Sequence, residues 1–335
     1  MAMAQVRDVA ERAGVSPATV SNAFNHPERV SAQTLARVQA AVEELGYIRN
    51  DAARQLRAGT NPAVGMVVLD AANPYFTDVA HGAEEHLTGL GRALLLGNSA
   101  QQSDREATYL NLFEEQRVAG ILIAPVGNVL PRLRRLKRNG ISVVIIDRKA
   151  GADELSSVSV DDERGGWLAA DHLIAQGARR VGVIGGPGNL RQVRQRLRGA
   201  QQRVKQTASA NVEFLDSAAM DTAAGRRVTE ELVKRPRSER PDALFATNDL
   251  VALGALQVLA RTGTSVPNDM LLVGYDDIEF AASATIPITS IRQPSAQMGQ
   301  HAAELLQRAM SEPDSPVEHT VFQPELIARE STLDG

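Results

Sequence analysis

Residues 14–25 read GVSPATVSNAFN, a stretch without a single charged side chain. Ser16 followed by Pro17 predicts the start of a helix, because a serine oxygen caps the first amides and a proline at the first position loses no needed hydrogen bond. One face of this helix is apolar and carries Val20, Ala23 and Phe24. The opposite face holds small and amide-bearing side chains, namely Ala18, Ser21, Asn22 and Asn25. The stretch therefore predicts a short helix with an uncharged polar face.

Two further helices are expected around this one, over about 6–14 and 31–46. Each ends at a glycine, and the second repeats apolar residues at helical spacing, at Leu35, Val38, Val42 and Leu45. The small residue Ala10, the glycine Gly14 and the apolar Val20 have the spacing of a helix-turn-helix. Taken alone, this spacing fits any pair of short helices equally well.

The hydrophobic pattern of the sequence changes after a weak helical pattern at 51–57 and a break at Gly59 and Pro62. Eight short apolar runs follow, separated by helical patterns: VGMVVLD, RALLLGN, GILIAP, SVVIID, VGVIGG, VEFLD, ALFAT and LLVGYD. Such runs predict buried parallel strands, four before Val158 and four after Arg180. Two similar α/β domains are expected, with ligands at the carboxyl ends of the strands. A short strand and a helix from Thr289, and an extended segment at 319–330, complete the chain.

The composition narrows the class of protein. The chain has 335 residues, enough for two or three domains with sizeable cores, and it has no cysteine, which excludes disulfides, thiolate zinc sites and cysteine nucleophiles. It has no apolar run of transmembrane length, and its first residues do not read as a signal peptide, so we expect a cytoplasmic protein without membrane contact. The net charge is −4, and the first 60 residues carry seven arginines against six carboxylates. Charge alone therefore does not decide for or against nucleic acid.

Several patterns in the sequence are similar to catalytic motifs but lack residues or spacings that those motifs require. The run VIGGPGN after a strand departs from the dinucleotide fingerprint, because Arg191 stands three positions after Gly188 where the fingerprint has glycine. The adjacent pairs Asp161–Asp162 and Asp276–Asp277 have no nucleophile or base beside them by motif. The six histidines are scattered without metal-ligand spacing. We therefore expect no enzyme, no metal and no cofactor.

The ordered motifs together resemble the LacI/GalR family of bacterial transcriptional regulators. The first part matches through VRDVAERAGVSPATVS, NHPERVS and RVQAAVEELGYIRNDAARQLR. The remainder matches through NPYF, DR at 147–148, VSVDDERGG, TNDLVALGAL, VGYDDIEF and IRQP. The resemblance implies an N-terminal all-α helix-turn-helix headpiece with a hinge helix, followed by an α/β periplasmic-binding-protein-like core of two parallel-sheet subdomains.

The same resemblance sets the expected boundaries. The headpiece covers 1–49, the hinge helix and linker 50–61, and the core 62–335. Within the core, the N-subdomain takes about 62–160 and 291–322. The C-subdomain takes about 161–290 and 323–335.

The resemblance also implies the residues that meet DNA. The uncharged helix is expected in the major groove, while arginines and helix-start amides hold phosphates. The implied set is Arg7, Ser16, Pro17, Ala18, Ser21, Asn22, Asn25, Arg29, Arg54, Leu56 and Arg57. Leu56 matches the hinge leucine that opens a minor-groove base step. Asn22 departs from the family, which usually has arginine there; an asparagine amide pairs with adenine rather than guanine, although it could also face solvent beside the groove.

The implied effector site lies between the core subdomains. Its residues are Asn73, Tyr75, Phe76, Asp147, Arg148, Arg196, Met220, Asn248 and Asp276. Met220 departs from relatives that carry an aromatic residue there. Carboxylates, guanidinium groups and an amide suit the hydroxyls of a small polyhydroxylated ligand, a sugar rather than a purine or an amino acid. Asn248 could instead only cap the following helix, and Asp276 could only bind loop amides.

We thus expect a repressor that acts as a homodimer on an approximately palindromic DNA operator and is controlled by the effector. No leucine-heptad tail follows Arg329, so a dimer is the default expectation, and the sequence leaves open whether dimers pair further. Two alternatives stay open at this point. One is a solute-binding protein for sugar uptake, and the other is a nucleotide-dependent enzyme on a doubly wound fold.

Overall fold

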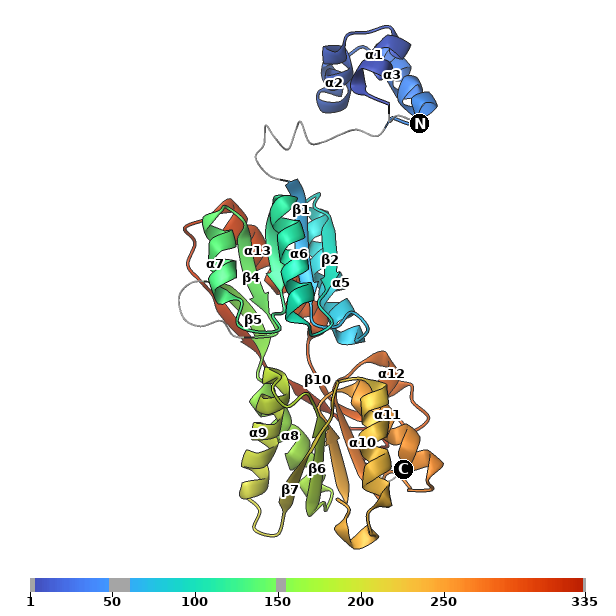
Figure 1. Cartoon of the computed structure of the whole chain (residues 1–335), viewed down its shortest axis with the longest axis vertical. Helices are drawn as coiled ribbons and strands as arrows, with labels where there is room; N and C mark the ends of the chain where they lie inside the picture. Colours follow the sequence, from blue (N-terminus) through green and yellow to red (C-terminus); the bar gives the residue numbers. More distant parts are fainter. Residues whose placement is uncertain (1–3, 48–60, 149–154, 334–335) are drawn as a thin grey trace. The chain divides into compact units, whose positions relative to one another are not determined.

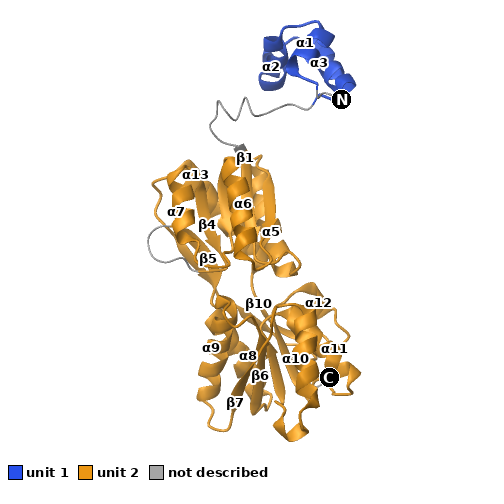
Figure 2. Ribbon diagram, viewed as in Figure 1, with its two compact units in different colours: residues 1–60 blue, residues 61–335 orange. Residues whose placement is uncertain are grey.

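The computed structural model describes residues 4–47, 61–148 and 155–333. It divides into two compact units, residues 1–60 and 61–335 (Figure 2). The expected hinge helix at 51–57 lies outside the described residues. No helix in the described ranges is long and apolar enough to cross a membrane.

The first unit is a bundle of three helices: α1 (Val6–Ala13), α2 (Pro17–Asn25) and α3 (Ala32–Leu45), with a 3-10 turn η1 (Pro27–Arg29) before α3. Ser16 caps α2, since its side chain accepts a hydrogen bond from the Thr19 amide at 3.1 Å. Gly14 ends α1 at a φ of 64°, a conformation that glycine adopts without strain. The bundle core is formed by buried Val9, Ala10, Ala13, Val20, Ala23, Val38 and Ala41. The helix-turn-helix predicted around Ala10, Gly14 and Val20 is therefore present.

The second unit contains two six-stranded sheets, each covered by helices (Figure 1). The first sheet has the order β11-β5-β4-β3-β1-β2 and is entirely parallel. Its strands are β1 (Asn61–Val68), β2 (Leu94–Asn98), β3 (Val118–Ile123), β4 (Ser142–Ile146), β5 (Ser156–Val160) and β11 (His319–Phe322). Its helices are α5 (Pro74–Gly89), α6 (Ser103–Glu115), α7 (Leu130–Arg138) and α13 (Ser295–Ser311).

The second sheet has the order β12-β10-β9-β8-β6-β7, and only the β10–β12 pair is antiparallel. Its strands are β6 (Arg180–Gly185), β7 (Asn211–Asp216), β8 (Ala243–Ala246), β9 (Leu271–Asp276), β10 (Thr289–Arg292) and β12 (Glu325–Ile327). Its helices are α8 (Asp162–Ala175), α9 (Arg191–Lys205), α10 (Thr222–Lys234), α11 (Asp249–Arg261) and the short α12 (Glu279–Ala282), with a 3-10 turn η2 (Arg237–Glu239). We call the two halves the N-subdomain and the C-subdomain.

Two features of the core differ from the sequence prediction. Strand β5 was not expected, because serines alternate with its two valines and break the apolar run: Ser157 and Ser159 are buried as well as Val158 and Val160, and Ser157 Oγ lies 2.8 Å from His319 Nδ1. The final extended segment splits between the sheets, with β11 in the first and β12 in the second. The expected boundary at 290/291 falls inside β10, so the chain returns to the N-subdomain only after Arg292.

Glycines set the distance between the helices that carry the site. On α8, a Cβ atom at Gly166 would lie 1.9 Å from the carbonyl oxygen of Arg196 on α9. On α9, a Cβ atom at Gly199 would lie 1.9 Å from the carbonyl oxygen of Glu163 on α8. The two helices therefore approach backbone to backbone, which fixes the position of Arg196 at the end of the C-subdomain sheet.

Candidate effector cleft and DNA-reading helix

A cavity lies between the two subdomains of the core, at the carboxyl ends of their strands. Its lining consists of Leu69, Asp70, Asn73, Tyr75, Phe76, Gln101, Asp147, Leu190, Gln192, Arg196, Met220, Asn248 and Asp276. Eight of the nine residues that the sequence predicted for the effector site are in this lining. The free space is only about 40 Å³, room for one or two water molecules.

Side chains of the two subdomains fill the cavity by bonding to each other. Gln192 Nε2, from α9, donates to Asp147 Oδ2, which follows β4, at 2.5 Å. Asn73 Nδ2, at the start of α5, donates to Asp276 Oδ2, at the end of β9, at 2.9 Å. Each bond joins an amide of one subdomain to a carboxylate of the other. These two bonds hold the cleft closed.

Arg196 is the cation at the centre of the cleft. Its Nε donates to Asp162 Oδ1 at 2.7 Å, and one terminal nitrogen donates to the Thr247 carbonyl at 2.6 Å. Its guanidinium carbon lies 3.6 Å from the centre of the Tyr275 ring. Burial opposes its charge, but the Asp162 carboxylate and the other acids nearby raise the pKa of Arg196, so it stays charged.

The two carboxyl groups that accept hydrogen bonds across the cleft have raised pKa values. Burial raises the pKa of Asp147 to about 7, and the Asp162 carboxylate adds to this rise while Arg196 acts against it. Burial also raises the pKa of Asp276 to about 6, against the stabilising effect of Arg196 on its charged form. Three acids surround one guanidinium here, so the cleft carries an excess of negative charge when they are ionised.

The backbone at these carboxylates is also unusual. Asp147 has a φ of 62° and Asp276 a φ of 107°, both in the left-handed region that side chains other than glycine rarely adopt. Such conformations concentrate where a fold holds a ligand-binding group in place. Two strands thus end in strained turns, and each turn presents a carboxylate to the cleft.

The two asparagines of the lining cap helices. Asn73 Oδ1 accepts a hydrogen bond from the Tyr75 amide at 3.1 Å. Asn248 Oδ1 accepts from the Val251 amide at 2.9 Å, and its Nδ2 donates to the Met220 carbonyl at 2.9 Å. The capping role considered for Asn248 is therefore present, and its Nδ2 bond also fixes the loop that carries Met220.

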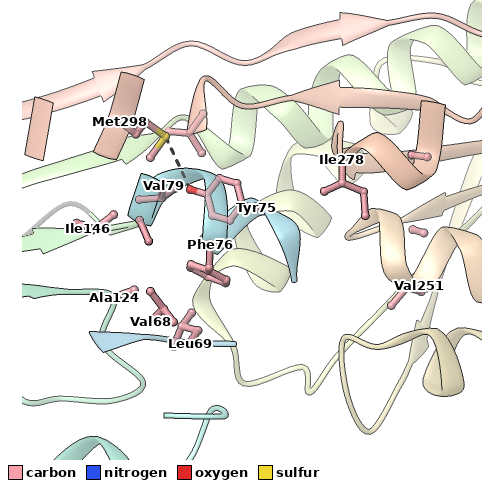
Figure 3. Close-up of a cluster of buried hydrophobic side chains, with 14 of the residues drawn as sticks. Val68, Leu69, Tyr75, Phe76, Val79, Ala124, Ile146, Val251, Ile278 and Met298 are labelled. Atoms are coloured by element: carbon pink, nitrogen blue, oxygen red, sulfur yellow. Dashed lines mark hydrogen bonds between the residues drawn. The ribbon is translucent and has the colours of Figure 1, made fainter. Parts of the chain in front are cut away.

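An aromatic pair forms the apolar wall on the N-subdomain side. The rings of Tyr75 and Phe76 lie 4.9 Å apart at 70° to each other. Tyr75 Oη donates to Asp147 Oδ1 at 3.2 Å and lies 3.8 Å from Met298 Sδ, and Figure 3 shows this contact with Phe76 directed toward Leu69. The Tyr75 hydroxyl thus links the aromatic wall to the Asp147 carboxylate.

Arg148 is the predicted site residue that does not line the cavity. One of its terminal nitrogens donates to the Gly127 carbonyl at 3.0 Å, and the residue borders a smaller neighbouring recess. The prediction missed Leu69, Asp70, Gln101, Leu190 and Gln192. Leu69, Asp70 and Gln101 follow the ends of β1 and β2, so their place after buried strands was the available signal.

Helix α2 presents its predicted polar face to solvent. Ser16, Pro17, Ala18, Ser21, Asn22 and Asn25 are all exposed, as are Arg7 and Arg29. Asn25 Nδ2 donates to the Ser21 carbonyl at 2.9 Å. The other three predicted DNA contacts, Arg54, Leu56 and Arg57, lie outside the described residues. Across the described ranges, no group of three histidine or carboxylate side chains is arranged to hold a metal ion.

Comparison with known proteins identifies this combination of headpiece and core. The family model for bacterial regulatory proteins, lacI family, matches residues 5–50, and that for the periplasmic binding protein-like domain matches 170–332. The HTH-type transcriptional repressor PurR of Aliivibrio fischeri (strain MJ11) is 32% identical over 334 residues, 99% of each chain. The ribose operon repressor of Bacillus subtilis (strain 168) is 34% identical over 304 residues, 91% of each chain.

A solved structure agrees with these relatives. The Lac repressor dimer bound to operator and the anti-inducer ONPF has a TM-score of 0.82 and 25% identity over 99% of this chain and 100% of that one. The protein is therefore a DNA-binding regulator with an effector-binding core. It belongs to the LacI family of transcriptional repressors, which are not enzymes.

The raised pKa values lead to a testable pH dependence. Between the unfolded pKa of 3.8 and the folded value of about 7, Asp147 holds its proton only in the folded state. The folded state then binds more protons, so the free energy of unfolding must fall as the pH rises through this window. We expect Asp147→Asn to reduce this decrease in the free energy of unfolding by on the order of a few kcal/mol. Denaturant unfolding at pH 4.5 to 8, followed by the single tryptophan, Trp167 of the core, measures it.

The exposed Asp314→Asn serves as the control for this series. It is expected to keep the pH dependence of the natural protein. Parallel curves for Asp147→Asn and the natural protein would show that Asp147 titrates normally.

Proposed function

We propose that this repressor responds to an uncharged, polyhydroxylated effector, a sugar, bound in the cleft between its subdomains. The proposed contacts are Asn73, Tyr75, Phe76, Asp147, Arg196, Met220, Asn248 and Asp276. The observation that carries the proposal is the pair of buried carboxylates, Asp147 and Asp276, that accept hydrogen bonds across the cleft. Arg148 is left out, since its guanidinium is bonded to Gly127.

The ligand must supply hydrogen-bond donors. Asp147 and Asp276 accept from amide nitrogens that reach over from the opposite subdomain. A hydroxyl group can replace each amide, because it donates to the carboxylate and still accepts from Arg196 or from the displaced amide. A sugar phosphate or a carboxylic acid is disfavoured, because it would add negative charge to three acids around a single guanidinium.

The aromatic wall favours a sugar over a purine. A flat bicyclic base gains most between two parallel walls, whereas Tyr75 and Phe76 are tilted at 70° to each other. Met220, which is not aromatic, lies in the C-subdomain part of the lining. PurR and the ribose operon repressor are at similar identity to this chain, so identity does not separate the two ligand classes.

On the DNA side, we propose that a homodimer places two α2 helices in the two halves of an approximately palindromic operator. A two-fold symmetric protein matches a two-fold symmetric site. The exposed, uncharged face of α2 then meets base edges, with Asn22 pairing with adenine, while Arg7 and Arg29 meet phosphates.

The effector proposal is tested by thermal unfolding with a defined panel. D-ribose, D-glucose, D-galactose and cellobiose are compared with ribose 5-phosphate, adenine and guanine. At least one neutral sugar is expected to raise Tm by several degrees at saturating concentration, because it binds only the folded state. Asp276→Asn is expected to weaken binding of that sugar by ~1–3 kcal/mol, since the amide nitrogen presents donors where the ligand needs an acceptor.

Asp314→Asn is the matched control, an exposed aspartate changed in the same way. Operator binding of both variants in a gel shift verifies that they are folded. A purine or the sugar phosphate as the strongest ligand, or full sugar affinity in Asp276→Asn, would contradict the proposal.

The DNA proposal is tested by selecting operators from random sequence. Asn22→Arg is expected to change the preferred base at one position per half-site from adenine to guanine, because a guanidinium pairs with both major-groove acceptors of guanine. The expected discrimination is ~1–3 kcal/mol. Selected sites that stay the same in the variant, or that contain one unrepeated half-site, would overturn the assignment.

A further inference from the structure

The turn after strand β2 carries two successive left-handed residues, neither of them glycine. Ala100 has a φ of 46° and Gln101 a φ of 59°. Two hydrogen bonds fix the turn: the Ala100 amide donates to Asn98 Oδ1 at 2.9 Å, and the Gln101 amide donates to the Leu69 carbonyl at 3.0 Å. Strain of this kind persists only where surrounding contacts impose it, and it collects at ligand-binding loops.

This turn delivers the Gln101 side chain into the lining of the cleft. Gln101 is half-buried, and its side-chain amide makes no hydrogen bond to any residue in the described ranges. The other polar side chains of the lining are all bonded to protein groups: Asp70, Asn73, Tyr75, Asp147, Gln192, Arg196, Asn248 and Asp276. Gln101 therefore differs from every other polar group in the cleft.

The difference matters for how a ligand is recognised. A hydroxyl that meets Asp147 or Asp276 replaces an existing hydrogen bond between protein groups. A hydroxyl that meets Gln101 breaks no hydrogen bond between protein groups in the described ranges, and the amide offers it two donors and an acceptor. A contact with Gln101 distinguishes one sugar from its isomers, because a ligand without the matching hydroxyl leaves the side-chain amide without a ligand partner.

Strand order places Gln101 away from Asp147. Asp147 follows β4 and Gln101 follows β2, and the order β4-β3-β1-β2 separates these strands by three spacings, about 14 Å in all. The turns that carry Gln101 and Asp147 therefore lie on opposite sides of the N-subdomain part of the cleft.

We propose that Gln101 determines which sugar this repressor accepts, by hydrogen bonding to a hydroxyl at the edge of the ring opposite Asp147. This inference rests on the sugar cleft proposed above. It assigns a role in specificity to a residue outside the motifs that suggested the site.

The test uses the neutral sugar that gives the largest Tm rise with the natural protein, together with its monodeoxy analogues. Titration calorimetry gives the Kd of each for the natural protein, Gln101→Ala and Gln102→Ala. Gln102 is the matched control, because it is an exposed glutamine at the adjacent position whose side chain does not cap α6. Gln101→Ala is expected to raise the Kd of the parent sugar about tenfold. For one deoxy analogue, the natural protein and Gln101→Ala are expected to have the same Kd.

A uniform loss for the parent sugar and every analogue would contradict the inference, because it would mean that Gln101 only supports the turn. Unchanged Kd values throughout would contradict it as well. If no neutral sugar binds the natural protein, the proposed function itself fails. If a sugar binds and Gln101→Ala keeps the same ratios between analogues, only the role of Gln101 fails.

Discussion

The buried pair of Arg196 and Asp162 is the interaction on which the cleft depends. Arg196 Nε lies 2.7 Å from Asp162 Oδ1, and both side chains are almost completely buried. A lone guanidinium at this depth would be costly, and so would a lone carboxylate. Asp162 stands at the start of α8, and the glycine contacts between α8 and α9 bring Arg196 to it. Packing of these two helices thus places one fixed positive charge where the strands of both subdomains end.

The remaining chemistry of the cleft follows from that charge. Asp147 and Asp276 approach Arg196 from different subdomains, and each also accepts an amide of the other half. The closed arrangement is therefore held by bonds that a ligand with hydroxyl groups can exchange one for one. A ligand controls DNA binding only if it binds the two states of the protein unequally, and this exchange provides a physical basis for such a difference.

Much of the architecture could be predicted from the sequence, because it depends on short-range patterns. Apolar runs located eight of the strands, and serine and glycine marked the helix ends, as at Ser16 and Gly14. Strand β5 was missed because Ser157 and Ser159 interrupt its apolar pattern although both are buried, and Ser157 Oγ is paired with His319 Nδ1. A hydrophobic pattern contains no sign of such a strand.

Site residues could be predicted where they belong to a sequence motif. They could not be predicted where the direction of the side chain determines whether a residue reaches the cleft. Asp147 and Asp276 belong to recognisable motifs, but the direction of a long side chain is set by its neighbours. Arg148 follows Asp147 directly and nevertheless bonds to Gly127 outside the cavity. Gln101 and Gln192 reach the cleft through a strained turn and a helix start, and neither feature can be read from residue types alone.

We propose that the effector cleft and the operator-binding headpiece act as one coupled system. Titration calorimetry of the full chain with the identified sugar, free and bound to its selected operator, measures this coupling directly. Linkage requires the Kd of the sugar to change on operator binding by the same factor as the Kd of the operator changes at saturating sugar, typically about 5–150-fold. We expect such a matched change. An identical sugar Kd with and without the operator would contradict it.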